Sequence, residues 1–175
     1  MGVISNVKKV CSFYVSSMHL ITMIMPHLRK QIEVDAGIST FFEYNLEETA
    51  NTVISKIILA DDKKEIISDL EWNSKNGYKF SHVEKEIKEA LSEFKELNIL
   101  VMGNANYIKA VNENVEVFLE KNARKISKKY ISIINCYEVG EFNENIKDIL
   151  DEHDYILNTS GMKEIEEVFE GYKKA

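Results

Sequence analysis

Proline, glycine and cysteine are scarce in this sequence. The chain has one proline, seven glycines and two cysteines among its 175 residues. No low-complexity stretch, internal repeat or domain linker is present, so we expect a single domain, residues 1–175, around one core. Cys11 and Cys136 lie far apart in the sequence and belong to no Cys-x-x-Cys pair. We therefore expect two reduced, buried thiols, as is usual in a cytoplasmic protein.

Basic clusters and long apolar runs are also missing. The chain carries 29 acidic against 22 basic side chains, which gives a formal net charge of -7. This balance favours neither nucleic acid nor an anionic membrane as a partner. The segment LITMIMPHL is too short to span a bilayer and contains the proline, and the N-terminus has no signal-peptide pattern. We expect a cytoplasmic location.

The sequence does contain a regular alternation of strand-like and helix-like segments. Runs of β-branched, aromatic or other apolar residues predict strands, and apolar residues at helical spacing predict the helices between them. The strands are expected at Lys9 to Val15, Ile38 to Tyr44, Glu65 to Trp72, Leu97 to Asn104, Lys129 to Val139 and Tyr155 to Asn158. The helices are expected at Met18 to Glu33 with Ser17 as N-cap, after Asn45, around Val83 to Phe94, and at Ala105 to Arg124, Asn143 to Glu152 and Ile165 to Tyr172.

This alternation predicts an α/β fold of three layers, Rossmann-like or RecA-like. Its sheet would be mostly parallel, with five or six strands and helices on both faces, because parallel neighbours need crossover connections. The most continuously apolar strand, Leu97 to Asn104, is expected at the centre. The strand order stays open at this level. In such sheets ligands bind beyond the carboxyl ends of the strands, so we expect functional residues there.

Motifs for nucleotide binding are absent. In a phosphate loop, glycines let successive backbone N–H groups converge on the phosphates, and a lysine neutralises them. The first strand-to-helix turn, VSSMHL, has neither residue, although Ser16 and Ser17 begin a helix whose donors could attract a small anion. The segment MGNANY has a single glycine instead of G-x-G-x-x-G. Gly103 is expected to permit a sharp turn, with Asn104 or Asn106 capping the following helix.

No spacing indicates a metal site or a catalytic nucleophile. The four histidines form no His-x-x-x-His motif, and no Glu-x-x-His, nucleophile elbow or Ser-His-Asp pattern is present. Cys11, His19 and Cys136 would approach one another only if the first and fifth strands are neighbours. Glu138 follows a core strand and is either a general base or, more commonly, an exposed carboxylate at a helix entrance. We therefore expect no enzyme activity, no cofactor and no metal.

Two segments of the chain resemble a known family. One is VCSFYVSSMHLITMIMPHLRKQIEVDAGISTFFEYNLEETANTVI, from Val10, and the other is IINCYEVGEFNENIKDILDEHDYILNTSG, which ends at Gly161. Both are similar to the MEDS domain, the methanogen/methylotroph DcmR sensory domain. In that family a Cys and a Phe-Tyr pair end the first strand, a Pro interrupts the next helix, and Cys-x-Tyr, a Phe, an Ile-Leu pair and a His follow in the closing segment. The family often has a His two residues before the first Cys, where this chain has Lys9.

The resemblance implies a RecA/KaiC-type fold that has lost the phosphate-binding loop. It also implies a non-catalytic sensory or regulatory module, which binds a small, largely apolar organic molecule and signals through a protein partner or a homodimer. Phe13 and Tyr14 occupy adjacent strand positions and therefore point to opposite faces of the sheet. The implied ligand-binding residues are Cys11, Phe13, Tyr14, Cys136, Tyr137 and His153, with Ser17 and His19 added from the first turn.

Two other functions stay open. A degenerate nucleotide-binding fold can act as a scaffold for protein association, which predicts a large apolar surface patch and no internal pocket. Alternatively, the chain is an enzyme with an unfamiliar site that uses a nucleotide or a flavin. A ligand-binding module predicts instead a concave pocket with a few polar groups.

Overall fold

The computed structural model describes residues 6–74 and 80–169 of the chain. Within these residues, six strands form one sheet in the order β2-β3-β4-β1-β5-β6. The strands are β1 (Val7–Tyr14), β2 (Gly37–Phe42), β3 (Glu96–Gly103), β4 (Tyr130–Glu138), β5 (Tyr155–Asn158) and β6 (Gly161–Glu164). The helices are α1 (Ser17–Glu33), α2 (Glu47–Ile54), α3 (Asp61–Ser68), α4 (Phe80–Glu93), α5 (Ala105–Lys121), α6 (Val139–Asp151) and α7 (Ile165–Val168).

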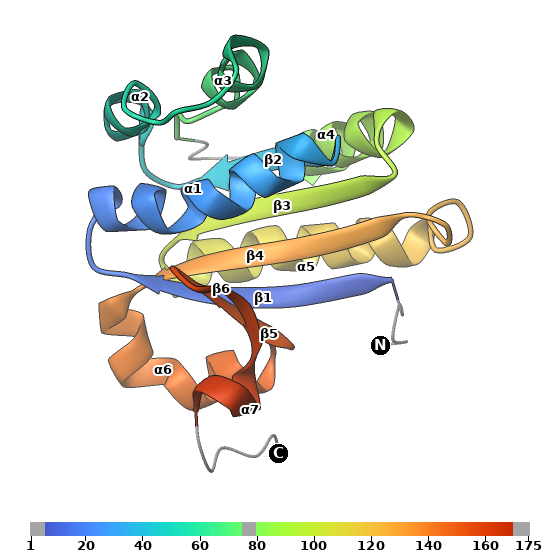
Figure 1. Cartoon of the computed structure of the whole chain (residues 1–175). Helices are drawn as coiled ribbons and strands as arrows, with labels where there is room; N and C mark the ends of the chain where they lie inside the picture. Colours follow the sequence, from blue (N-terminus) through green and yellow to red (C-terminus); the bar gives the residue numbers. More distant parts are fainter. Residues whose placement is uncertain (1–5, 75–79, 170–175) are drawn as a thin grey trace.

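The sheet is parallel except at one edge. β2, β3, β4, β1 and β5 pair in parallel, and β6 pairs antiparallel with β5. The five parallel strands have the RecA-like order. Helices cover both faces, so the chain has three layers, which confirms the predicted α/β class (Figure 1). No helix among the described residues has the length and apolar character needed to cross a bilayer.

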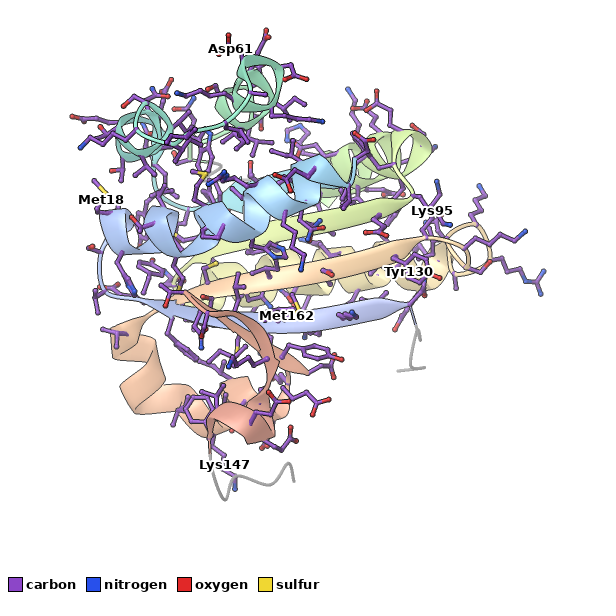
Figure 2. The ribbon with its side chains drawn as sticks, in the orientation of Figure 1. Met18, Asp61, Lys95, Tyr130, Lys147 and Met162 are labelled. Atoms are coloured by element: carbon purple, nitrogen blue, oxygen red, sulfur yellow. The ribbon has the colours of Figure 1, made fainter. Side chains whose placement is uncertain are left out.

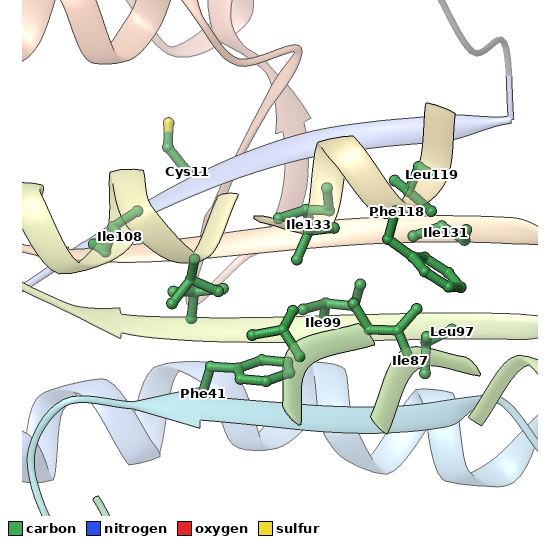
Figure 3. Packing of buried hydrophobic residues seen from close by; sticks show 14 of the residues in the cluster. Cys11, Phe41, Ile87, Leu97, Ile99, Ile108, Phe118, Leu119, Ile131 and Ile133 are labelled. Carbon is green, nitrogen blue, oxygen red and sulfur yellow. The ribbon is translucent and has the colours of Figure 1, made fainter. Parts of the chain in front are cut away.

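Each face of the sheet carries its own hydrophobic core. One core packs α1, α2 and α3 against the sheet, and the other packs α4, α5, α6 and α7 against the opposite face. Successive strand residues alternate between the two cores: Ile99 and Val101 of β3 face α4 and α5, whereas Leu100 and Met102 face α1. Figure 3 shows the α4–α5 side, where Ile99 and Phe41 pack together with helix residues. Burial on both faces explains the continuous apolar sequence of β3.

The connections diverge between the neighbouring strands β1 and β4. β1 leads into α1 on one face of the sheet, and β4 leads into α6 on the other face. Two adjacent parallel strands whose crossovers leave in opposite directions define a topological switch point, the usual ligand-binding position in open α/β sheets. Ligand binding at the carboxyl ends therefore depends on the residues that follow these two strands.

The predicted strand from Glu65 to Trp72 is wrong, because Asp61–Ser68 forms helix α3. Ile67 is fully buried while Ile66 is largely exposed, as expected for a helix that buries one side. A short apolar run does not distinguish a strand from a helix by its periodicity. The two aspartates of the first turn, Asp61 and Asp62, are the local signal for a helix start, since carboxylates there interact favourably with the helix dipole.

The last third of the chain differs from the prediction in three respects. α6 begins at Val139, directly after β4, rather than at Asn143. β6 was not predicted, and it forms a hairpin with β5. The final helix covers Ile165–Val168, and the end of the predicted helix, up to Tyr172, lies outside the described residues.

The β5–β6 hairpin depends on its turn residues. Asn158 pairs with Gly161, so Thr159 and Ser160 form the turn between them. The Asn158 side chain accepts hydrogen bonds from the backbone N–H of Ser160 at 2.9 Å and from its hydroxyl at 2.7 Å. Gly161 has φ +107°, a conformation that glycine adopts most readily. Asparagine and glycine at these positions are typical turn signals.

Substitution of Gly37 tests the packing between the start of β2 and the end of α4. A Cβ at Gly37 would lie 2.5 Å from Cδ2 of Phe94, whereas a Cβ at Gly140 would meet no atom within 4 Å. We expect Gly37→Ala to lower the free energy of unfolding by about 1–3 kcal/mol, because added volume strains a packed core. Gly140→Ala, inside helix α6, should leave stability unchanged or raise it. Urea unfolding of the two variants measures the difference, and equal stabilities would contradict this packing.

Candidate functional site

The first strand-to-helix turn bonds two of its backbone donors to its own side chains. Ser16, not Ser17 as predicted, is the N-cap of α1, and its hydroxyl accepts from the backbone N–H of His19 at 3.1 Å. The imidazole Nδ1 of His19 accepts from the backbone N–H of Val15 at 3.0 Å. A phosphate would have to displace these side-chain contacts. The turn therefore has the position of a phosphate loop, but two of its backbone donors are already bonded and it has no lysine.

The neighbouring strand ends are capped by side chains as well. Both carboxylate oxygens of Glu43 accept from Asn104, one from its backbone N–H at 2.9 Å and one from Nδ2 at 3.3 Å. The Asn104 side chain accepts in turn from the backbone N–H of Tyr107 at 2.8 Å, which confirms the predicted cap of α5. Position 103 needs glycine because the backbone passes close to two side chains. A Cβ there would lie 2.8 Å from Cβ of Glu43 and 2.7 Å from Cδ1 of Tyr107.

Carboxylates and phenols dominate this edge of the sheet. Burial raises the pKa of Tyr14 far above its ordinary value, and the nearby Cys136 thiol and Glu138 carboxylate raise it further. Burial likewise raises the pKa of Tyr107 to about 12, with a smaller contribution from Glu43. Both phenols stay protonated at neutral pH. An edge with two carboxylates and no lysine among these residues repels a phosphate rather than binding it.

The eight predicted ligand-binding residues lie on both faces of the sheet. Tyr14 and Cys136 belong to the α1-side core, while Ser17 and His19 lie in the first turn of α1. The other four, Cys11, Phe13, Tyr137 and His153, lie on the α5–α6 side. The structure therefore does not gather the eight into one pocket.

A small cluster of rings nevertheless forms on the α5–α6 side. The Tyr137 ring lies 5.9 Å from the Phe13 ring and 6.0 Å from the His153 ring, centroid to centroid. The three rings are buried or half-buried between the sheet and the helices. In this arrangement they contribute to the core, as aromatic pairs usually do.

The two thiols are close to each other in the sheet but face opposite ways. β1 and β4 are neighbours, and Cys11 is paired with Asn135, one position before Cys136. Burial raises the pKa of Cys136 to about 12, and Cys11 adds to the shift, so this thiol is neutral and unreactive at pH 7. Among the described residues, no group of three His, Cys, Asp or Glu side chains could hold a metal ion.

His153 belongs to a buried hydrogen-bond network that sequence analysis missed. Asn112 and Asn135 exchange two hydrogen bonds, at 2.8 and 3.0 Å. The remaining Nδ2 hydrogen of Asn135 points to Nε2 of His153 at 2.9 Å, and Nδ1 of His153 lies 2.6 Å from the carbonyl oxygen of Ile149. This set is consistent with one protonation state, a neutral imidazole that donates from Nδ1 and accepts at Nε2. The network ties β4 to α5 and to the end of α6.

A cavity lies elsewhere among the described residues, between α1 and the β5–β6 hairpin. We call it the α1–hairpin groove. It is half-open, has a volume of about 650 Å³ and lies over the amino-terminal halves of the central strands. Figure 2 shows Tyr130 at the start of β4 and Met162 in the hairpin, two of its lining residues. The others are Asn6, Lys8, Met23, Pro26, His27, Lys30, Gln31, Glu96, Leu97, Asn98, Ile131, Ser132, Leu157, Asn158, Thr159, Ser160 and Gly161.

A row of polar side chains forms the floor of the groove. Lys8 of β1 is in register with Ser132 of β4, which is in register with Asn98 of β3. Two residues further along each strand, the same face carries only apolar residues: Val10, Ile134 and Leu100. Central strands covered on both faces are normally apolar throughout. The side chains on this face of the sheet therefore change from apolar to polar where the strands reach the groove.

Helix α1 is tied to this floor through Asn98, which is 3% exposed. Its Nδ2 donates to Oε1 of Gln31 at 3.1 Å and to the carbonyl oxygen of Gly37 at 3.4 Å. Its Oδ1 lies 3.2 Å from Nε2 of His27, so this nitrogen carries the hydrogen. Burial lowers the pKa of His27, which outweighs the opposite effect of the Asn98 hydrogen bond. His27 is therefore neutral at pH 7.

The groove could not be located from the sequence. Its signal is the polar residue at the start of each central strand, in VKKV, LNIL and ISII. Such residues are ordinary at strand ends, and they become a row only once the register is known. The β5–β6 hairpin, which forms one wall of the groove, was also not predicted from the sequence.

Substitution of Asn135 tests the buried network. Asn135→Leu leaves Asn112 and His153 with unpaired polar groups, so we expect a loss of about 1–3 kcal/mol for each abandoned partner. The double variant Asn112→Leu, Asn135→Leu should lose less free energy of unfolding than the sum of the two single variants. In the double variant, neither asparagine is left without its partner. Asn106→Leu on the exposed side of α5 serves as the control. Strictly additive free energies in urea unfolding would contradict the network.

The lowered pKa of His27 predicts a pH effect on stability. A histidine with a pKa of about 6.5 in the unfolded chain and a lower one in the folded chain contributes stability above pH 6.5 and loses it as the pH falls through the folded value. The melting temperature of the wild type should therefore drop more than that of His27→Gln between pH 7.5 and pH 5. His82→Gln removes an exposed histidine of α4 as a control. A constant difference between wild type and His27→Gln across this range would refute the effect.

Neither the comparison with protein-family models nor that with curated proteins finds a match. Among solved structures, the chain is similar to an uncharacterized protein from Pyrococcus horikoshii, crystallised in complex with an unknown peptide. The two share 13% sequence identity, the match covers 89% of this chain and 81% of that one, and the TM-score is 0.46.

Proposed function

We propose that this chain is a non-catalytic sensory or regulatory module that binds a small organic molecule in the α1–hairpin groove. The observation that carries the proposal is the polar row of Lys8, Ser132 and Asn98 at the floor of a half-open groove. A volume of about 650 Å³ lies within the usual range for small-molecule sites. A structural role would favour apolar residues under α1, as the rest of this face has.

The groove suits a molecule with one apolar and one polar part. Met23 and Pro26 line it from α1, and Leu157 and Met162 line it from the hairpin. Methionine side chains adapt their shape to different partners, which favours contact with small apolar groups. The polar floor offers a lysine and a hydroxyl as donors. The ligand expected from the sequence, a largely apolar molecule, would therefore also need a polar group.

Nucleotide binding is the weaker alternative. In the first turn, the backbone N–H of Val15 donates to His19 and that of His19 donates to Ser16. Carboxylates occupy the neighbouring strand ends. A triphosphate needs free backbone donors and a cation at this position. In this turn two backbone donors are already bonded to side chains, and no lysine is present among these residues.

Helix α1 provides a route by which ligand binding could reach a protein partner. Its second half lines the groove, and its first turn lies at the carboxyl edge of the sheet. Its 17 residues span about 25 Å.

Four large apolar side chains are exposed in the segments that follow β1, β2 and β4: Val15 at 64%, Met18 at 47%, Tyr44 at 50% and Val139 at 39%. Exposed apolar residues at one edge favour association with another protein. A small shift of α1 on ligand binding would change this edge.

The proposal is tested by closing the groove. Ser132→Phe places a ring on the groove floor, and Ser127→Phe places the same ring on an exposed turn as a matched control. A library of small organic fragments is screened by thermal shift, with Mg²⁺-ATP and FMN as additional arms. We expect fragments that raise the melting temperature of the wild type and of Ser127→Phe but not of Ser132→Phe, because only the native groove binds them.

Two outcomes would reject the proposal. One is a screen in which every stabilising fragment also stabilises Ser132→Phe. The other is stabilisation by Mg²⁺-ATP or FMN, which would favour the nucleotide or flavin alternative.

A further inference from the structure

The charges that line the α1–hairpin groove are opposite in sign to the chain as a whole. The chain has a net charge of -7. Among the described residues that line the groove, Lys8 and Lys30 are cationic and Glu96 is anionic, while His27 is neutral because burial lowers its pKa. The groove thus combines two ammonium groups with one carboxylate in an acidic protein.

Neither lysine is neutralised by a described carboxylate. An ion pair joins a different lysine, Lys9, to Glu116 at 3.3 Å on the other face of the sheet. Lys8 instead lies with its Nζ 5.5 Å from the centre of the Tyr155 ring. A ring face holds an ammonium group without taking its N–H donors as a carboxylate does. Lys8 is therefore held at the hairpin side of the groove with donors available.

A hydroxyl donor lies beside Lys8 at the floor. Ser132 is paired with Lys8 on the neighbouring strand, which places the two residues about 5 Å apart across the sheet. Its hydroxyl has no hydrogen-bond partner among the residues that the structure describes. Lys30 approaches from the opposite wall, α1. Lys8, Lys30 and Ser132 line the same groove, and together they offer donors that suit an anion with two acceptor oxygens.

We propose that the groove binds a small organic carboxylate whose apolar part is a short chain. The carboxylate would accept hydrogen bonds from Lys8, Lys30 and Ser132, and the chain would pack against Met23 and Met162. This inference rests on the proposed function, because it assigns a ligand class to the same groove. It differs from the expectation of a largely apolar, uncharged ligand.

The test compares octanoate with octanamide, which has the same chain and no charge. Isothermal titration calorimetry measures the Kd of each for the wild type, Lys8→Met, Lys30→Met and the control Lys163→Met, an exposed lysine of β6 outside the groove. Methionine keeps the apolar stem of lysine and removes the charge. We expect each groove variant to weaken octanoate about tenfold, the loss of one charge-assisted hydrogen bond, and Lys163→Met to leave it unchanged. The Kd of octanoate should also rise with added salt, and octanamide should bind at least about tenfold more weakly.

The outcomes separate this inference from the proposed function. Equal binding of octanoate and octanamide, unaffected by Lys8→Met and Lys30→Met but lost in Ser132→Phe, would overturn the carboxylate assignment and leave the groove as a binding site. Octanoate binding that survives in Ser132→Phe would place the anion elsewhere and also overturn it. Absence of saturable octanoate binding overturns it as well, and the fragment screen then decides the proposed function on its own.

Discussion

The register among β1, β4 and β3 is the constraint on which the rest of the structure depends. Pairing Lys8 with Ser132 and Ser132 with Asn98 places polar side chains in one row and, two residues on, Val10, Ile134 and Leu100 in the next. Because side chains alternate between faces with a period of two, a slip of one residue would turn the polar row into the α5 core and expose the apolar one. The same register sets Cys11 and Cys136 on opposite faces.

As a result, the carboxyl ends of the strands and their amino-terminal halves carry different polar groups. At the carboxyl edge, the chain's own side chains take the backbone donors: His19 and Ser16 in the first turn, and Glu43 at the next strand end. Hydrogen bonds made within the protein compete directly with those a phosphate would make. At the amino-terminal half, α1 and the hairpin diverge and leave a polar floor accessible. The fold thus keeps the usual location of a nucleotide site, while the α1–hairpin groove lies at the opposite ends of the strands.

Helix α1 connects these two regions and is anchored to β3 through the buried side chain of Asn98. His27 and Gln31 bond to Asn98, and most of the other contacts between the helix and the sheet are apolar. Pro26, adjacent to His27, removes one backbone donor from the helix at the groove. A directional anchor and one missing backbone donor are consistent with the small shift of α1 that we propose on ligand binding.

The sequence by itself determined the α/β class, the mostly parallel sheet, the buried thiols and a cap of α5 at either Asn104 or Asn106, because these depend on local periodicity and on turn residues. It did not distinguish helix α3 from a strand, since EIISDLEW is too short for its period to decide. Tertiary structure alone decided which residues share a surface. Lys8, Ser132 and Asn98 are separated by up to 124 positions in the chain, and only the pairing of strands brings them into one row. The sequence predicted that Phe13 and Tyr14 point to opposite faces of the sheet, and the structure shows that the whole set of expected ligand-binding residues is divided between the two faces.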